Sequence, residues 1–251
     1  MTNLVQVSRD QFANKGWKRP KDYTFAASDA AVGLVWSEMP AAALAMPIAF
    51  MHQEPDTYLP IALTSPRPGR NVFVAPLGQW LGTYVPFALR TYPFRLLRVQ
   101  DSDQVVLCVD DDSGLIVDPD EAAEKFYEPD GSLSAIVKGI FENLQQIEAD
   151  RIRTSLAVAA LQQADVIKPW PLTIPVGEQK MQVNGLYCVD EAAFNALDDA
   201  SFLKLRKAPA LGGAYFQMQS MAQIHMLGQM ALLQERSESA DAGTPSELVP
   251  T

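Results

Sequence analysis

Short apolar runs separated by turn-forming residues dominate residues 28–117. The runs "PIAF", "YLPIALT" and "NVFVA" are rich in residues that favour strands, and the proline-rich "SPRPGRN" between the last two predicts a loop. Further on, "RLLRV" and "QVVLCVD" flank "QDSD", an arrangement that predicts a hairpin. We therefore expect this part of the chain to form mainly antiparallel β-structure.

The pattern becomes helical after residue 117. Asp118 is placed to cap a helix, Pro119 suits the first turn, and Glu121 stands three residues after the cap. The sequence therefore predicts a helix start at Asp118. A long helix is predicted over residues 132–164, because apolar residues recur there at helical spacing: Ile136, Ile140, Leu144 and Ile147. The three prolines of "KPWPLTIPVGE" end this helix.

A strand pair and further helices complete the C-terminal half. "KMQVNGLYCVD" predicts a strand pair near residues 181–189 that turns at Asn184-Gly185. Asp190 is placed to cap the next helix, "ALGG" is expected to break the chain, and a last helix is predicted over residues 214–233. Methionines of that region suit either a core or a homodimer surface: Met218, Met221, Met226 and Met230.

These elements predict an α+β fold, in which a mainly antiparallel β-rich N-terminal part is followed by a mainly helical C-terminal part. Residues 1–27 are expected to form an extended arm that attaches through its aromatic side chains. The β-rich part then covers residues 28–117, and the helical part, with its short strand pair, covers residues 118–235. Residues 236–251 are rich in Ser, Glu and Ala, which predicts a disordered tail.

Composition and charge narrow the classes of partner. The chain has 251 residues, 48% of them hydrophobic, and a net charge of −10, so it can bury a core but repels nucleic acid. One basic run, "KGWKRPK", is interpreted as solvated and includes Arg19 and Lys21. The most apolar window, "MPAAALAMPIAFM", is too short to span a membrane, and no signal peptide is visible. We therefore expect a cytoplasmic protein.

The segment "LGQWLGTYVPFALRTYPFRLL", residues 77–97, is the main candidate for a binding site. Pro86 favours a short helix at "PFALR", and Pro93 ends it. The segment would present Trp80, Tyr84, Arg90 and Tyr92, a set suited to a small anionic or peptide-like ligand. The alternative is structural: the apolar side chains fill the core, and Arg90 pairs with a carboxylate such as Glu38 or Asp110.

Glu38 precedes an apolar run, where burial could raise its pKa. It is therefore both a candidate ligand contact and a candidate acid or base. An enzyme would use Glu38 or Asp110 together with Arg90. No nucleophile elbow or phosphate loop is visible, and we expect no cofactor. "VDDDSG" fails as a calcium loop because Leu115 stands where glycine is needed, so no metal site is expected.

Five segments resemble the SapC-like family of bacterial proteins. They are "EMPAAALAMPIAF" (38–50), "GRNVFVAPLGQWLGTYVPFALRTYPF" (69–94), "LCVDDDSG" (107–114), "GLYCVDEAAFNAL" (185–197) and "FLKLRKAPALGGAYFQMQSM" (202–221). The resemblance implies a role in nutrient uptake or ligand handling, and the family name implies an association with surface layers. It supplies no catalytic residues.

Three functions remain open at this point. A non-catalytic ligand-binding or adaptor protein is favoured, because the aromatic and arginine-rich segment has no catalytic motif beside it. The alternatives are an enzyme that acts on a small anionic or peptide-like substrate, and a structural homodimer or surface-layer accessory protein.

Overall fold

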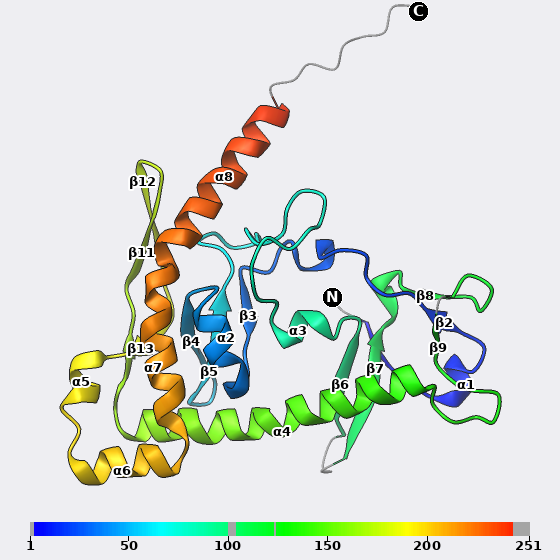
Figure 1. Ribbon diagram of the computed structural model, residues 1–251, viewed down its shortest axis with the longest axis horizontal. Coiled ribbons are helices and arrows are strands. Elements are labelled where there is room, and N and C mark those ends of the chain that lie inside the picture. Colours follow the sequence, from blue (N-terminus) through cyan, green and yellow to red (C-terminus); the bar gives the residue numbers. More distant parts are fainter. Residues whose placement is uncertain (1–2, 100–103, 123, 243–251) are drawn as a thin grey trace, which may run out of the picture.

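A five-stranded antiparallel sheet forms the centre of the main core and takes strands from both halves of the sequence (Figure 1). The computed structural model describes residues 3–99, 104–122 and 124–242. In the order β10-β13-β4-β5-β3, the strands are Ile167–Pro169, Leu186–Val189, Ile48–Gln53, Thr57–Leu63 and Ala31–Gly33. The β4–β5 hairpin confirms two of the predicted runs, and the fold is α+β as expected.

A second sheet has the order β1-β7-β6, with strands Leu4–Gln6, Val105–Asp110 and Phe94–Arg98. The pairing of β6 with β7 confirms the predicted hairpin. A third small sheet joins β8 (Ile116–Val117), β2 (Gly16–Trp17) and β9 (Glu124–Lys125). Residues 1–27, predicted as an extended arm, thus contribute β1, α1 (Arg9–Phe12), β2 and a short 3₁₀ turn at Thr24–Ala26. Phe12 and Trp17 are almost fully buried.

Helix α4 (Ala135–Gln163) connects two hydrophobic cores. Its first turn is capped by Ser134, whose hydroxyl oxygen accepts a hydrogen bond from the Val137 amide. Towards its N-terminus, Leu144 packs in the smaller core around the second sheet, and nearer its C-terminus Leu161 packs in the main core. Figure 1 shows α4 running below the central sheet and crossing the β6–β7 hairpin, and the long helix predicted at residues 132–164 is confirmed.

Most of the remaining helices contribute side chains to the main core. These remaining helices are the 3₁₀ turn η2 (Trp36–Glu38), α2 (Met39–Ala43), α3 (Phe87–Arg90), the 3₁₀ turn η3 (Asp111–Ser113), α5 (Glu191–Asn195), α6 (Asp199–Lys207), α7 (Ala210–Ser220), the 3₁₀ turn η4 (Met221–Gln223) and α8 (Ile224–Ala242). None of the helices in the described part of the chain is long and apolar enough to cross a membrane.

The helix start predicted at Asp118 and the hairpin predicted at residues 181–189 are both wrong, because these segments pair with distant strands instead. At Asp118 the chain makes only a turn, in which the Glu121 amide donates to the Asp118 carbonyl oxygen, before β9 joins the third sheet. The strand pair predicted at residues 181–189 is not a hairpin. β12 (Gln179–Val183) pairs with β11 (Leu172–Val176), whereas β13 enters the central sheet.

Two further predictions fail for other reasons. "NVFVA" forms no strand and makes only an isolated bridge between Val74 and Trp80. "ALGG" does not break the chain, because α7 runs through Gly212 and Gly213. The Trp36 indole packs against the helix where Gly213 has no side chain, and its Nε1 donates to the Pro209 carbonyl oxygen.

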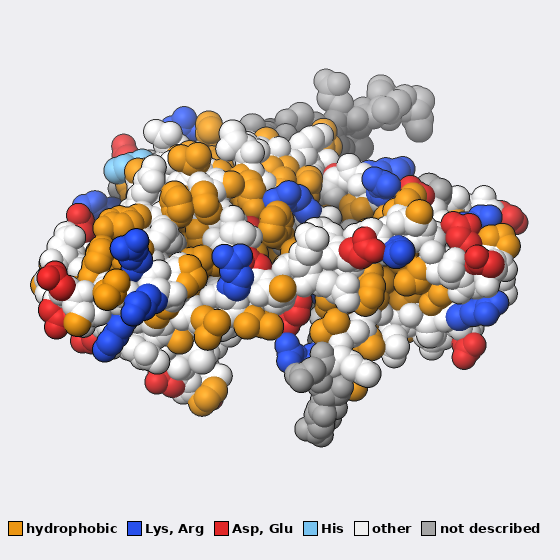
Figure 2. All heavy atoms as spheres, turned by 60° about the horizontal axis from the view of Figure 1, so that its bottom comes forward, with side chains coloured by type: hydrophobic (Ala, Val, Ile, Leu, Met, Phe, Trp, Pro, Cys, Tyr) orange, Lys and Arg blue, Asp and Glu red, His pale blue; other side chains and the backbone are white. Residues whose placement is uncertain are grey.

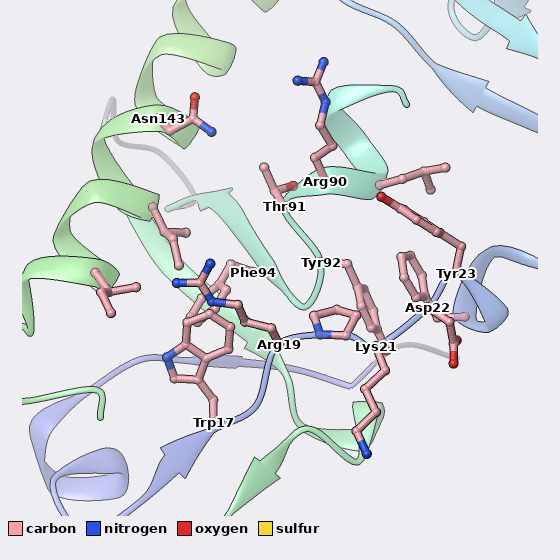
Figure 3. Close-up of a pocket in the computed structure, with 15 residues that line it drawn as sticks. Trp17, Arg19, Lys21, Asp22, Tyr23, Arg90, Thr91, Tyr92, Phe94 and Asn143 are labelled. Atoms are coloured by element: carbon pink, nitrogen blue, oxygen red, sulfur yellow. The ribbon is translucent and has the colours of Figure 1, made fainter. Parts of the chain in front are cut away.

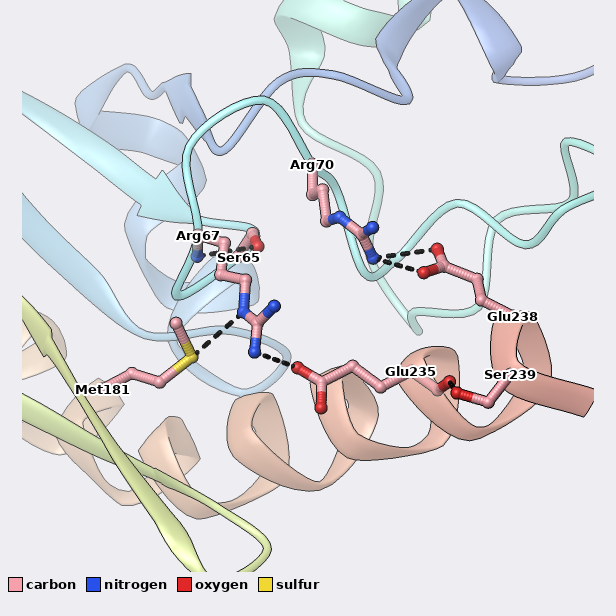
Figure 4. Close-up of polar contacts among 7 residues, drawn as sticks. All are labelled: Ser65, Arg67, Arg70, Met181, Glu235, Glu238 and Ser239. Carbon is pink, nitrogen blue, oxygen red and sulfur yellow. Dashed lines mark hydrogen bonds and ion pairs between the residues drawn. The ribbon is translucent and has the colours of Figure 1, made fainter. Parts of the chain in front are cut away.

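The last helix extends further than expected. Residues 236–242, predicted as disordered, continue α8, and residues 243–251 lie outside the described residues. The loop between β5 and α3 holds this helix through two ion pairs (Figure 4), Arg67 to Glu235 at 2.6 Å and Arg70 to Glu238 at 2.7 Å. Three of the methionines singled out above pack against the main core, namely Met218, Met226 and Met230.

Hydrophobic side chains remain exposed on the helical face of the molecule. Figure 2 shows them gathered over its left half, with lysine and arginine side chains among them. Exposed apolar residues of the helices include Ile152 and Leu156 on α4 and Leu203 on α6.

The two adjacent glycines of α7 make a matched pair of substitutions. A Cβ at position 213 would lie 2.0 Å from Trp36 Cζ2, whereas a Cβ at position 212 would lie 3.8 Å from Phe216 Cε2. We expect Gly213→Ala to lower the free energy of unfolding by about 2 kcal/mol through overpacking. Gly212→Ala should instead raise it by up to about 1 kcal/mol, through helix propensity. Urea unfolding measures both, and equal effects of the two substitutions would contradict this packing.

Candidate functional site

Glu38 is a buried carboxylate that joins two segments far apart in the sequence. Only 2% of its surface is exposed. Its Oε2 accepts a hydrogen bond from the Val35 amide at 3.0 Å. Its Oε1 accepts two more, from the Tyr84 hydroxyl at 2.8 Å and from the Phe87 amide at 2.6 Å. The carboxylate therefore fixes the first residue of α3 to the turn at residues 35–38.

Arg90 reaches this carboxylate through Tyr84. Arg90 Nη2 donates to the Tyr84 hydroxyl oxygen at 3.0 Å, and the guanidinium carbon lies 4.3 Å from the centre of the Phe87 ring. Burial raises the pKa of Glu38, although its hydrogen bonds and the Arg90 charge oppose the shift. Burial and the nearby Glu38 also raise the pKa of Tyr84. Tyr84 is therefore a neutral hydroxyl that links Arg90 to Glu38.

Trp80 and Tyr92, the other two predicted contacts, lie on either side of this network. Trp80 Nε1 donates to the Tyr84 carbonyl oxygen at 2.8 Å, and its ring stacks on Phe73. Tyr92 stacks on Phe25 with ring centres 4.0 Å apart, and its hydroxyl donates to Asp110 Oδ2 at 3.4 Å. The structure therefore joins Glu38, Tyr84 and Arg90 in one hydrogen-bond network, with Trp80 bonded to Tyr84, and Tyr92 is not part of that network.

Tyr92 lines a cleft of about 420 Å³ that we call the aromatic cleft (Figure 3). Three separate regions of the chain form it: residues 17–25, residues 89–94 and one face of α4. Its aromatic side chains are Trp17, Tyr23, Phe25, Tyr92 and Phe94. The α4 face supplies Asn143 and two isoleucines, so the cleft combines flat apolar walls with a few polar groups.

Three cations and one carboxylate line the aromatic cleft: Arg19, Lys21, Arg90 and Asp22. Asp22 accepts hydrogen bonds from the hydroxyl and amide of Thr24, which lower its pKa. Arg19 uses Nη2 to pair with Glu124 at 3.2 Å. Figure 3 shows the Arg19 guanidinium extending across the cleft towards α4, whereas the Arg90 guanidinium points away from Tyr92.

Arg19 and Lys21 are exposed, as expected for the basic run. They also line this cleft beside Trp17 and Tyr23, a position that the sequence did not predict. The available signal was the mixture of basic and aromatic residues in "WKRPKDYTF". Local pattern could not place α4 and residues 89–94 opposite them.

Two buried polar atoms near this region have no hydrogen-bond partner among the described residues: Trp17 Nε1 and Asp110 Oδ1. In the described parts of the chain, no three His, Cys, Asp or Glu side chains converge as metal ligands would. Cys108 and Cys188 are both free. Burial, and for Cys188 the nearby Asp190, raises the pKa of each thiol, that of Cys188 to about 11. Both are therefore thiols, and not thiolates, at neutral pH.

A family model described as SapC matches residues 7–227. The chain belongs to the SapC family. The matched region of this SapC-family chain contains Glu38, α3 and all five strands of the central sheet. No curated protein and no solved structure matches the chain.

Glu38→Gln tests the buried carboxylate. The amide keeps one acceptor oxygen but places an NH₂ group opposite at least one donor, so we expect a loss of about 2 kcal/mol in the free energy of unfolding at neutral pH. The pKa of Glu38 is raised above its ordinary value of 4.5, so the folded state binds the proton more tightly than the unfolded chain. This stabilisation is complete below the ordinary pKa and is lost as pH rises through the raised pKa.

The stability difference between wild type and Glu38→Gln should therefore widen as pH falls from about 7 to about 5. Urea unfolding across this range measures it. A difference that narrows on acidification would show that the folded state does not favour the protonated carboxyl.

Proposed function

We propose that this SapC-family chain is a non-catalytic ligand-binding protein and that the aromatic cleft holds its ligand. The ligand would be small and anionic, or peptide-like with a carboxylate, and would carry a flat apolar group. The observation that carries the proposal is that five aromatic side chains and the Arg19 guanidinium line one cleft of a chain whose net charge is −10.

The dimensions and chemistry of the cleft support this proposal. Its volume of about 420 Å³ lies within the range of small-molecule sites. Aromatic rings offer large rigid contact areas at low entropic cost, and an arginine fork suits a carboxylate. Arg19 pairs with Glu124 through one nitrogen only among the described residues, which leaves donors for a ligand.

The bonding of Glu38 favours binding over acid–base catalysis. Both of its oxygens already accept hydrogen bonds, three in total, and among the described residues Arg90 hydrogen-bonds to Tyr84 and pairs with no carboxylate. An acid or base that exchanges protons with a substrate needs a position within hydrogen-bond reach of it. Glu38 instead serves as an acceptor that holds α3.

We also propose a cytoplasmic location, a link to nutrient uptake and an adaptor role for the chain. A homodimer through the methionine-rich last helix remains part of the proposal. The partial burial of Met226 and Met230 against the main core leaves less of that helix for a dimer.

Calorimetric titration with N-acetylphenylalanine tests the proposal, because this probe combines a ring, a peptide group and a carboxylate. We expect binding in the submillimolar range, and binding at least tenfold weaker for the amide of the same compound, which lacks the charge. Equal affinity for the two compounds, or no binding of either, would refute the proposed anionic ligand.

Two substitutions test whether the ligand occupies the aromatic cleft. Arg19→Gln should weaken binding about tenfold, through the loss of a charge-assisted hydrogen bond. Arg153→Gln is the matched control, because its side chain is 65% exposed against 67% for Arg19, and it also pairs with an acidic side chain. If both variants bind as wild type does, the ligand does not occupy the aromatic cleft.

A further inference from the structure

A second cleft, of about 410 Å³, lies on the other side of α3. Thr91 and Phe94 line both clefts, so the end of α3 and the start of β6 form a wall between them. Figure 1 shows α3 above α4, between β3 and β6. The lining of the cleft comes mainly from α3, α4, β5 and β6. We call this space the aliphatic cleft because of its dominant side chains: Leu34, Leu59, Leu96, Leu97, Leu144 and Ile147.

The aliphatic cleft follows the boundary between the two hydrophobic cores. Leu34 and Leu59 belong to the main core, whereas Leu96, Leu144 and Ile147 belong to the smaller one. Both walls are apolar, yet a space remains between them, and Leu97 is still 40% exposed. Removing such surface from water is favourable, so an apolar chain in the cleft would gain binding free energy.

The polar groups of the aliphatic cleft are mostly engaged. Thr154 and Ser155 donate their hydroxyls to carbonyl oxygens of their own helix. Glu38 accepts three hydrogen bonds at the wall that contains α3. The walls therefore offer few groups that would orient a polar ligand along its length.

Where the cleft meets solvent, the arginine side chains are more exposed than the carboxylate with which they pair. Glu148 forms ion pairs with Arg98 at 3.4 Å and with Arg151 at 3.3 Å, and Arg95 lines the same cleft. Of the charged residues that line the cleft, Arg95 and Arg151 balance Glu38 and Glu148, but Glu38 is buried and already accepts three hydrogen bonds, and Glu148 is held between two arginines. The side chain of Arg151 is 66% exposed, which places a cation where the cleft meets solvent.

We propose that the aliphatic cleft binds a single-chain amphiphile with an anionic head, of which a fatty acid is the simplest example. The chain lies between the walls of the two cores, and the carboxylate lies at the arginines. This site is separate from the aromatic cleft and does not depend on the function proposed for it.

Calorimetric titration with dodecanoate below its micellar concentration tests the proposal, with dodecyltrimethylammonium as the cationic counterpart. We expect dodecanoate to bind with micromolar affinity and the cationic amphiphile at least tenfold more weakly. Equal binding of the two amphiphiles would contradict the proposal that the head is anionic. The absence of dodecanoate binding would contradict the proposal that the cleft binds an amphiphile.

Two pairs of variants locate the chain and the head. Leu97→Asp places a charge on the wall of the cleft, and Leu156→Asp places one at a residue that is 63% exposed and outside it. Arg151→Gln and Arg153→Gln remove arginines of equal exposure, each paired with an acid three residues before it. We expect Leu97→Asp and Arg151→Gln to weaken dodecanoate binding at least fivefold, and the two controls to leave it unchanged.

Thermal unfolding of each variant separates lost binding from lost folding. A folded Leu97→Asp variant that binds dodecanoate as wild type does would overturn the placement of the chain. The same result for Arg151→Gln would overturn the placement of the head.

Discussion

The buried carboxylate of Glu38 is the interaction on which the arrangement of both clefts depends. α3 has only four residues, too few to be stable as an isolated helix, so its position must be imposed from outside. Glu38 imposes it by accepting hydrogen bonds from the Phe87 amide and the Tyr84 hydroxyl, while also holding the Val35 amide. Removing the carboxylate would leave three buried or partly buried donors without an acceptor, and unsatisfied donors lower the stability of the folded state.

α4 is the second constraint, because it holds together two cores that the chain builds from different segments. The central sheet includes β10 and β13 from the C-terminal half, whereas the second sheet begins with β1 near the N-terminus. α4 packs on both. The aromatic and aliphatic clefts both lie along α4, on opposite sides of α3. They differ in chemistry because the walls of one are aromatic and basic, and those of the other are aliphatic.

The sequence pattern predicted those helices and hairpins that are determined by residues close together in the chain. The helical spacing of Ile136, Ile140 and Leu144 identified α4, and the hairpin β6–β7 follows from two apolar runs around a polar turn. Pairings between distant segments were not predictable, such as β13 beside β4 or the Glu38 bonds to α3. For the same reason the position of the exposed Arg19 beside a cleft was not predictable. The sequence singled out residues 77–97 as a candidate, but whether their side chains face a cleft depends on contacts made by residues 17–25.

Amide hydrogen exchange tests the central role of Glu38 most directly, by comparing the wild-type protein with Glu38→Ala. The Val35 and Phe87 amides, which both donate to Glu38, should be protected in the wild type and should exchange much faster in the variant. The Trp170 amide, which donates to the Leu186 carbonyl oxygen, should keep its protection in both. Unchanged protection of Phe87 in a folded Glu38→Ala variant would show that α3 is held by something other than this carboxylate.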